Sequence, residues 1–299
     1  MSVVEKTFYK GEVIVKEGDI GDSFFRLLEG KASVYADYGK KDQDPFRIAL
    51  LETGEYFGEM AIIDSIPRNA TIVAVGNVRV IEIPKDDLTS YFQDNPDQIF
   101  VLMKHLANRI KAMTNDYNDA KALLKEVKDA EASKKKSLFS RIKKHVDIYE
   151  SNKDTIAPPS ADAIRQAFES ITDEGIGDIQ ACEKDTIIYS EGEVDNNMFI
   201  LRSGKIGMYN SDREKISELT PVSLFGEMGA LVGDPRDATA VAEEDDTQVE
   251  VVYPEYLESL FLSCPVKIEL ILRQLSYRLR VLNCDFIAIC KQITETYNK

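Results

Sequence analysis

The sequence has few of the residues from which catalytic and metal sites are usually built. It contains two histidines, His105 and His145, and neither has a nucleophile or a metal-ligand spacing around it. No G-x-S-x-G or H-E-x-x-H motif is present. We therefore expect a protein that is not an enzyme and that holds no metal or iron–sulfur centre. The four cysteines form no C-x-x-C pair and are expected to be buried free thiols: Cys182, Cys264, Cys284 and Cys290.

Long apolar runs and an excess of positive charge are also missing. No run approaches the roughly 18 apolar residues of a membrane span, and the N-terminus lacks the basic-then-apolar order of a secretion signal. The 37 Lys and Arg residues stand against 52 Asp and Glu residues, which gives a net charge of −15. Because neutralising phosphates requires a basic surface, this balance disfavours DNA or RNA as the main partner. A cytoplasmic protein is the expectation.

The sequence does contain one eighteen-residue phrase in two copies. FGEMAIIDSIPRNATIVA spans residues 57–74, and FGEMGALVGDPRDATAVA spans residues 225–242. The similarity extends upstream, where Val15–Tyr35 matches Tyr189–Tyr209, and downstream into an apolar segment. The chain of 299 residues is long enough for two ordinary domains. A repeat of this extent therefore predicts two homologous domains.

Each copy changes its hydrophobic period along its length. Short alternating stretches such as KASVYA and VRVIEI are separated by glycine turns, which indicates a compact β-barrel or jelly roll. The apolar residues that follow are spaced by three and four, as in the heptad seam of a long helix. In copy one the seam is Met103, Leu106, Ile110, Met113, Tyr117, Ala120, Leu124 and Val127. The predicted fold class is α+β, with two repeated β-roll (jelly-roll) domains, each followed by a long helix.

We place the first domain at residues 1–128, a charged helical linker at 129–160 and the second domain at 161–299. The linker has six basic and no acidic residues within 133–144. A solvated connecting helix is the plainer interpretation, and a docking surface for an acidic partner or a membrane at Lys134–Lys144 is the alternative. If this stretch is helical, one face carries Leu138, Ile142, His145 and Val146.

The repeated phrase holds residues that suit an anion carrying a hydroxyl group. Gly58 permits close approach of a ligand, and the residues after Glu59 could form a short helical turn whose N–H groups face an anion. Arg68 supplies a planar fork for two phosphate oxygens. A carboxylate beside an anion is repulsive unless it accepts a hydrogen bond, for instance from a sugar hydroxyl. The combination predicts a phosphorylated sugar or a nucleotide. The alternative is that Glu59 and Arg68 only pair with each other in a loop.

A nucleoside triphosphate or a dinucleotide is a weaker candidate for the ligand, because the sequence has no P-loop and no G-x-G-x-x-G motif. The pairs FGEMA with PRNAT and FGEMG with PRDAT instead resemble the phosphate-binding cassette of the cyclic-nucleotide-binding domain family. That family includes the bacterial cAMP receptor protein, the regulatory subunits of cAMP-dependent protein kinase and nucleotide-gated channels. The resemblance covers most of the chain outside 129–160.

The resemblance implies a ligand, cAMP or cGMP, and no other cofactor. Glu59 and Glu227 would accept hydrogen bonds from the ribose 2′-hydroxyl, while Arg68 and Arg236 would bind the cyclic phosphate. The binding residues implied for the first cassette are Gly58, Glu59, Met60, Ala61, Arg68, Asn69, Ala70 and Thr71. Those implied for the second cassette are Gly226, Glu227, Met228, Gly229, Arg236, Asp237, Ala238 and Thr239.

Copy two departs from the family pattern at two positions. Gly229 stands where the family favours alanine, which would loosen the phosphate cradle slightly. Asp237 follows the arginine where copy one has Asn69, and it could compete for the guanidinium or accept a hydrogen bond from a guanine amine. We therefore expect the two sites to differ. The family also implies a lid over the base, for which Tyr117 and Phe286 are candidates, although both fit a core or a dimer seam equally well.

The function implied is that of a cytosolic sensor or regulator that binds cyclic nucleotide at two sites and signals by helix rearrangement. Neither a catalytic nor a DNA-binding domain is expected, and the absence of an R-R-x-A/S sequence leaves kinase inhibition without support. The alternatives are a sensor of another phosphate ligand, such as a cyclic dinucleotide, and a ligand-free interaction scaffold. The heptad seams make a homodimer through the long helices plausible, and the downstream protein partner is not indicated.

Overall fold

The structure is a computed structural model that describes residues 4–36, 38–39, 46–59, 67–68, 70–129, 138–152 and 178–297. These residues form two compact units. The first unit holds the described residues within 1–91, 109–159 and 276–299, and the second holds those within 92–108 and 160–275. Two helices, α2 (Asp97–Asp129) and α8 (Pro265–Tyr297), contribute residues to both units.

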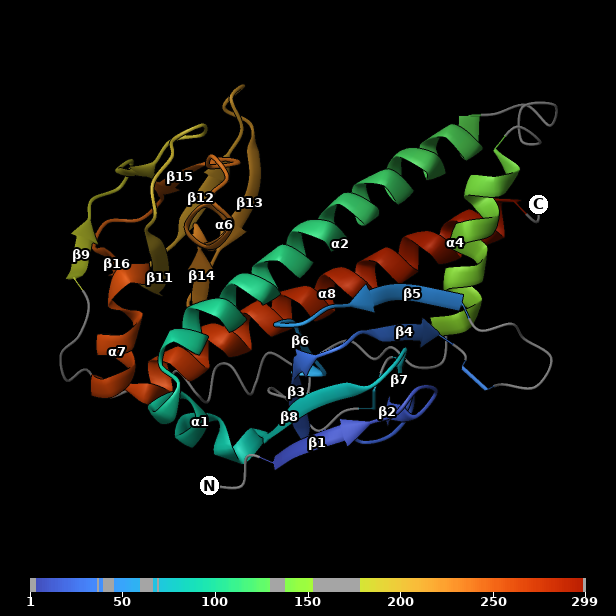
Figure 1. The fold of residues 1–299 in the computed structure, drawn as a ribbon. Coiled ribbons are helices and arrows are strands. Elements are labelled where there is room, and N and C mark those ends of the chain that lie inside the picture. The colour runs from blue at the N-terminus through green and yellow to red at the C-terminus, as the bar shows by residue number, and fades with distance from the viewer. Residues whose placement is uncertain are drawn as a thin grey trace. The chain divides into compact units, whose positions relative to one another are not determined.

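The first copy of the repeat forms a β-roll of two four-stranded antiparallel sheets (Figure 1). The strand orders are β1-β8-β3-β6 and β2-β7-β4-β5, and Leu27 of β3 lies opposite Val80 of β8. Both sheets contribute to one core, in which Phe25 stacks on Phe57 beside Ile72. The strands are β1 (Val4–Phe8), β2 (Val13–Val15), β3 (Ser23–Glu29), β4 (Ala32–Ala36), β5 (Phe46–Leu51), β6 (Tyr56–Phe57), β7 (Thr71–Ala74) and β8 (Val78–Pro84).

The second copy repeats this arrangement strand for strand. Its sheets have the orders β9-β16-β11-β14 and β10-β15-β12-β13, and Phe199, Phe225 and Ala240 belong to the core between them. The strands are β9 (Asp178–Cys182), β10 (Ile187–Tyr189), β11 (Met198–Ser203), β12 (Ile206–Tyr209), β13 (Lys215–Leu219), β14 (Ser223–Phe225), β15 (Thr239–Ala242) and β16 (Thr247–Val252). A single pattern of alternating apolar residues thus folds twice into the same roll.

A long helix follows each roll, as the seam of apolar residues predicts. Both α2 and α8 have 33 residues, and each comes after a short 3-10 turn and a short helix. In α2 the seam residues Met103, Leu106 and Ile110 are buried. The preceding elements are η2 (Lys85–Asp87) and α1 (Leu88–Asp94) in copy one, and η3 (Pro254–Tyr256) and α7 (Leu257–Ser263) in copy two. The predicted fold class is confirmed.

A helical core lies in the first unit, where α4 (Phe139–Asn152) packs with parts of α2 and α8. The predicted shared face of this helix is confirmed, because Leu138, Ile142 and Val146 all belong to this cluster and His145 is buried against Phe286. Phe286 and Tyr117 are part of the same cluster. Their packing agrees with the core interpretation of these two residues. Residues 130–137 and 153–160 of the predicted linker and residues 161–177 of the predicted second domain lie outside the described residues.

The cysteines do not form disulfides or a metal site in the described part of the chain. None of the four is in a disulfide within the described ranges, and Cys182 and Cys290 are buried while Cys264 and Cys284 are half-buried. Burial raises the pKa of the Cys290 thiol to about 12, so the reactive thiolate form is suppressed. No group of three or more potential metal ligands is present among the described residues. The helices in the described ranges include none that is long and apolar enough to cross a membrane.

The burial of His145 predicts a loss of stability on mild acidification. Desolvation lowers the pKa of His145 below its usual value of 6.5, and the hydrogen bond of Nδ1 to the backbone oxygen of Arg141 (2.8 Å) opposes this only in part. The unfolded chain therefore binds a proton first as the pH falls below about 6.5, and each unit of pKa depression costs the fold about 1.4 kcal/mol at acid pH. We expect urea denaturation at pH 7.5 and 5.5 to show a larger loss of stability in the natural protein than in His145→Gln. Equal losses would contradict this.

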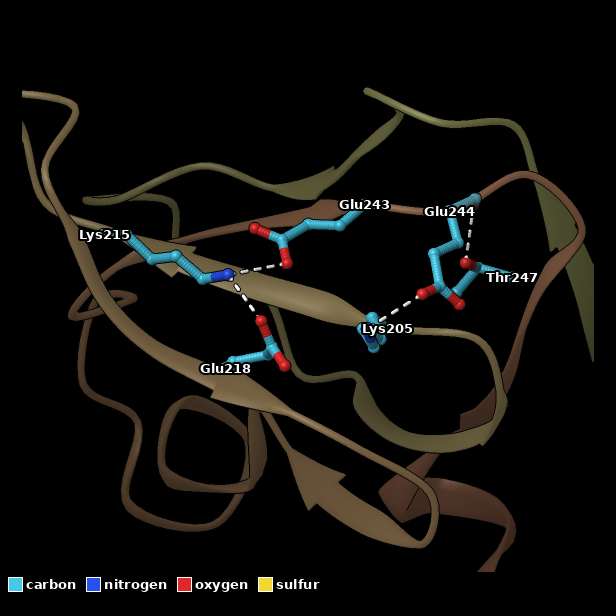
Figure 2. Close-up of polar contacts among 6 residues, drawn as sticks. All are labelled: Lys205, Lys215, Glu218, Glu243, Glu244 and Thr247. Atoms are coloured by element: carbon cyan, nitrogen blue, oxygen red, sulfur yellow. Dashed lines mark hydrogen bonds and ion pairs between the residues drawn. The ribbon is translucent and has the colours of Figure 1, made fainter.

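A network of charged side chains lies on the β10-β15-β12-β13 sheet of the second copy (Figure 2). Lys215 contacts Glu218 and Glu243 at 2.7 Å each, and Lys205 contacts Glu244 at 3.0 Å. The hydrogen bond from Lys215 lowers the pKa of Glu243. Ion pairs this exposed stabilise a fold only slightly. Copy one has Val75 and Gly76 in place of Glu243 and Glu244, which directly follow β15, so this network distinguishes the two copies.

Candidate functional site

The glutamate of the first cassette is buried, with one carboxylate oxygen hydrogen-bonded and the other without a partner in the described part of the chain. Glu59 follows β6 and is 0% exposed. Its Oε1 accepts a charge-assisted hydrogen bond from Nη1 of Arg109 on α2, and its Oε2 is buried without a hydrogen-bond partner among the described residues. Because a buried charged oxygen without a donor is costly, Oε2 fits a donor group supplied by a ligand.

The arginine of the first cassette is held by backbone oxygens. Nη1 of Arg68 donates to the carbonyl of Gly58 (2.9 Å), and Nη2 donates to the carbonyl of Ser23 (2.5 Å). Burial lowers the pKa of Arg68, while the charges of Asp22 and Glu59 raise it, and a guanidinium stays protonated at neutral pH. Glu59 and Arg68 therefore have separate hydrogen-bond partners, which differs from the arrangement that simple pairing in a loop requires.

The loop between β2 and β3 fixes the backbone of the first cassette. The N–H of Gly18 donates to the carbonyl of Arg68 (2.9 Å), and the N–H of Arg68 donates to the carbonyl of Asp19 (2.8 Å). Thr71, at the start of β7, accepts from the N–H of Glu17 with its hydroxyl (3.0 Å). Ala70 lies half-buried next to it, whereas the predicted site residues Met60, Ala61 and Asn69 lie outside the described residues.

Glycine is required before the cassette glutamate. Gly58 has φ of +71°, a conformation that L-residues other than glycine adopt at a cost. A Cβ atom there would also lie 2.7 Å from Nη1 of Arg68. Gly226 in the second copy has φ of +70° and the same 2.7 Å approach to Nη1 of Arg236. In both copies the glycine leaves the space that the guanidinium fills.

The second cassette continues into the short helix α6 (Glu227–Val232). We predicted a helical turn after Glu59, where residues 60–66 lie outside the described residues. Copy two has such a turn at the corresponding place, and Glu227 at its start is 1% exposed. A Cβ atom at Gly229 would lie 3.0 Å from Nη1 of Arg236. The departure from alanine at this position thus allows the helix and the guanidinium to lie closer together. Met228 is half-buried, Ala238 is buried and Thr239 is half-buried.

The arginine of the second cassette differs from its counterpart because a carboxylate holds it. Nε of Arg236 donates to Oδ2 of Asp195 at 3.0 Å, and Nη2 donates to Oδ1 of the same residue. Nη2 also donates to the carbonyl of Asn197 (2.7 Å), and Nη1 donates to that of Gly226. For Asp237 we considered either competition for the guanidinium or acceptance of a hydrogen bond from a guanine amine. The carboxylate on the guanidinium belongs to Asp195 instead, and Asp237 is exposed, so the first alternative is wrong and the second stays a prediction.

Two residues that contact the cassettes, Arg109 and Asp195, were not predicted from the sequence. Each is distant in sequence from its partner, so neither spacing nor periodicity reveals the contact. Aligning the two copies gives a signal for each. Arg109 corresponds to Arg278, so both copies carry an arginine there. Asp195 corresponds to Gly21 and Asn196 to Asp22, so the carboxylate of this loop stands one position earlier in copy two than in copy one.

The comparisons with known proteins identify the family. The model named cyclic nucleotide-binding domain matches residues 5–95 and 179–264, together more than half of the chain. The cAMP-dependent protein kinase regulatory subunit of Candida albicans is 24% identical over 238 residues, which make up 80% of this chain and 40% of that protein. A cGMP-dependent protein kinase of Plasmodium berghei is 46% identical over 71 residues, 24% of this chain and 8% of that protein.

Similar domains also occur in a different class of regulator. A CRP-like cAMP-activated global transcriptional regulator of Mycobacterium tuberculosis is 26% identical over 114 residues, which make up 38% of this chain and 49% of that protein. The chain thus spans less than half of the length of these relatives. The two matched regions coincide with the two β-rolls and contain both cassettes. The chain belongs to the cyclic nucleotide-binding domain family and carries two of its domains.

Proposed function

We propose that the chain is a regulator that binds a cyclic mononucleotide, cAMP or cGMP, in the first cassette and responds through α2. The observation that carries the proposal is the state of Glu59, whose Oε2 is buried without a partner among the described residues. Arg68 lies close enough for the charge of Glu59 to raise the pKa of its guanidinium. A ligand with a hydroxyl donor and an anionic phosphate would satisfy both groups at once. A cyclic nucleotide has a ribose 2′-hydroxyl and a single phosphate charge in the required combination.

Through the contact between Glu59 and Arg109, a bound ligand would affect the position of α2. Arg109 is on the long helix and donates to the same carboxylate that the ribose would approach. A hydroxyl on Oε2 would change the charge distribution on the carboxylate and the position that Arg109 prefers. A ligand that binds one arrangement of roll and helix better than another shifts the population between them. The output would be a changed helical surface.

The second cassette supplies the same glutamate and arginine, at Glu227 and Arg236, and is proposed as a second cyclic-nucleotide site. The domain boundaries at 1–128 and 161–299 and a homodimer through the long helices stay predictions. The site groups bind and orient rather than react, so we propose a sensor without catalysis of its own. Its downstream partner is proposed to be a protein that contacts the helices.

A double-mutant cycle between Glu59 and the ribose hydroxyl tests this proposal. Calorimetry should give a lower affinity for 2′-deoxy-cAMP than for cAMP in the natural protein, by about 10- to 100-fold, because a hydrogen bond to a charged group is lost. In Glu59→Ala the two ligands should bind with similar affinity, because the acceptor is absent. The background is Arg236→Ala, which restricts the titration to the first site.

The matched control for this cycle is Glu29→Ala, which removes an exposed carboxylate at the end of β3. It should preserve the full preference for cAMP over 2′-deoxy-cAMP. If Glu59→Ala kept that preference, Glu59 would not be the ribose acceptor and the proposed pose would be wrong. Tight binding of a cyclic dinucleotide with no binding of either mononucleotide would replace the proposed ligand with that class.

A further inference from the structure

Among the described residues, the two cassette arginines use different numbers of hydrogen-bond donors: Arg68 donates two hydrogen bonds and Arg236 donates four. A guanidinium has five N–H groups and binds phosphate through two that lie side by side. Acceptors in the described residues take four of the five in Arg236: both oxygens of Asp195 and the carbonyls of Asn197 and Gly226. Asp195 takes the edge formed by Nε and Nη2. No pair of adjacent N–H groups is left for a phosphate in this arrangement.

The surroundings of Arg236 make this pairing tight. Its side chain is only 1% exposed, and the guanidinium carbon lies 4.4 Å from the ring centre of Tyr189 and 5.6 Å from that of Phe199. A charge this buried needs a neutralising partner. Asp195 supplies it in a rigid setting, because its Oδ1 also accepts from the backbone N–H of Asn197 at 2.8 Å.

The first copy has the same loop, but its carboxylate, Asp22, stands one position later in the sequence. There it raises the pKa of Arg68 by its charge, while the hydrogen bonds of the guanidinium to described residues go to the carbonyls of Gly58 and Ser23. The N–H of Gly192 donates to the carbonyl of Arg236 and the N–H of Arg236 donates to that of Glu193, at 2.8 Å each, as in the first cassette. Gly21 occupies the position of Asp195. A Cβ atom at Gly21 would lie 2.8 Å from Nη1 of Arg68, so that position has no room for a side chain while the guanidinium stays in place.

Building on the proposed function, we propose that Asp195 is an internal competitor that occupies Arg236 and weakens the second site for cyclic nucleotide relative to the first. The phosphate must displace Asp195 from the Nε and Nη2 edge before it can bind there. The apparent dissociation constant then rises by the factor that separates the closed state from the open state. The carboxylate also repels the phosphate for as long as it stays nearby. The second site therefore responds only at higher nucleotide concentrations.

The test titrates cAMP and cGMP by calorimetry into the full chain carrying Arg68→Ala, which leaves only the second site. Adding Asp195→Asn keeps the length of the side chain and one carbonyl acceptor but removes the charge and the bidentate pair. We expect it to raise the affinity of the second site by about 10- to 100-fold. Asp195→Gly, which restores the copy-one residue, should raise it as well. The charge-matched control is Asp212→Asn in the exposed turn between β12 and β13, with an expected change below twofold.

The outcomes separate this inference from the proposed function. Unchanged affinity in both Asp195 variants, with normal binding at the first site of the natural protein, would overturn the inference and leave the proposed function standing. Weaker binding in both variants would also overturn it, because Asp195 would then position the guanidinium for phosphate. No binding of either nucleotide at either site, in any variant, would overturn the proposed function itself. Thermal unfolding of each variant shows whether it is folded. If either Asp195→Asn or Asp195→Gly does not fold, the other variant still tests the inference.

Discussion

Replacing Arg68 by alanine is expected to reduce the affinity of the first site for cyclic nucleotide by about 30-fold to several thousand-fold. In the proposed site the guanidinium meets the phosphate, and truncating one partner of a desolvated, hydrogen-bonded charge pair costs about 2–5 kcal/mol. The effect should appear in the dissociation rate more than in the association rate. Calorimetry or surface binding with the Arg236→Ala chain as reference would measure it.

Arg79→Ala is the matched control for this change. Arg79 is 50% exposed and pairs with Glu5 and Glu29 on the surface of the first roll. Exposed pairs of this kind contribute about 0–1 kcal/mol to stability, so this variant should bind nucleotide as the natural protein does. A loss of affinity in Arg79→Ala equal to that in Arg68→Ala would mean that general charge, and not the placed guanidinium, governs binding.

Replacing Gly58 by alanine is expected to damage both the fold and the first site. The residue has φ of +71°, and an L-residue in that conformation costs about 1–2 kcal/mol. The added Cβ atom would lie 2.7 Å from Nη1 of Arg68. Because the end of an arginine side chain can move more easily than the backbone, the guanidinium should leave its place. We expect an affinity loss of at least about tenfold, together with a lower midpoint of urea denaturation.

Gly54→Ala separates the two effects. Gly54 also has a positive φ, of +95°, but a Cβ atom there would meet nothing within 4 Å. Both Gly54→Ala and Gly58→Ala therefore introduce backbone strain, but only Gly58→Ala also introduces a collision with Arg68. Gly54→Ala should lower stability and leave nucleotide affinity unchanged. Equal affinity losses in both variants would show that strain alone, and not displacement of Arg68, impairs the site.

Much of the fold follows from local patterns in the sequence. The repeated phrase predicts two equal domains, and the change from alternating residues to residues spaced by three and four predicts a roll followed by a helix. The burial of Met103, Leu106 and Ile110 in α2 agrees with the seam read from the sequence. These features depend on neighbours along the chain, which is why a single sequence reveals them.

The partners of the site residues could not be predicted in the same way. Arg109 reaches Glu59 across 50 positions, and Asp195 reaches Arg236 across 41 positions. Such contacts depend on which loop or helix the fold brings to the cassette. From the sequence alone, the carboxylate nearest to Arg236 is its neighbour Asp237, and the prediction therefore named that residue. Phe286 illustrates the same limit, because a seam residue, a lid and a core residue share one sequence pattern. Its packing against the helical core is visible only in the structure.

The central claim is that the chain binds a cyclic mononucleotide through its cassettes, and a calorimetric titration of the purified natural protein tests it most directly. Any ligand retained from expression must first be removed by unfolding and refolding. We predict a tight binding event with cAMP or cGMP at the first site and a weaker event at the second. The absence of binding heat with both nucleotides, together with no shift in thermal unfolding, would contradict the claim.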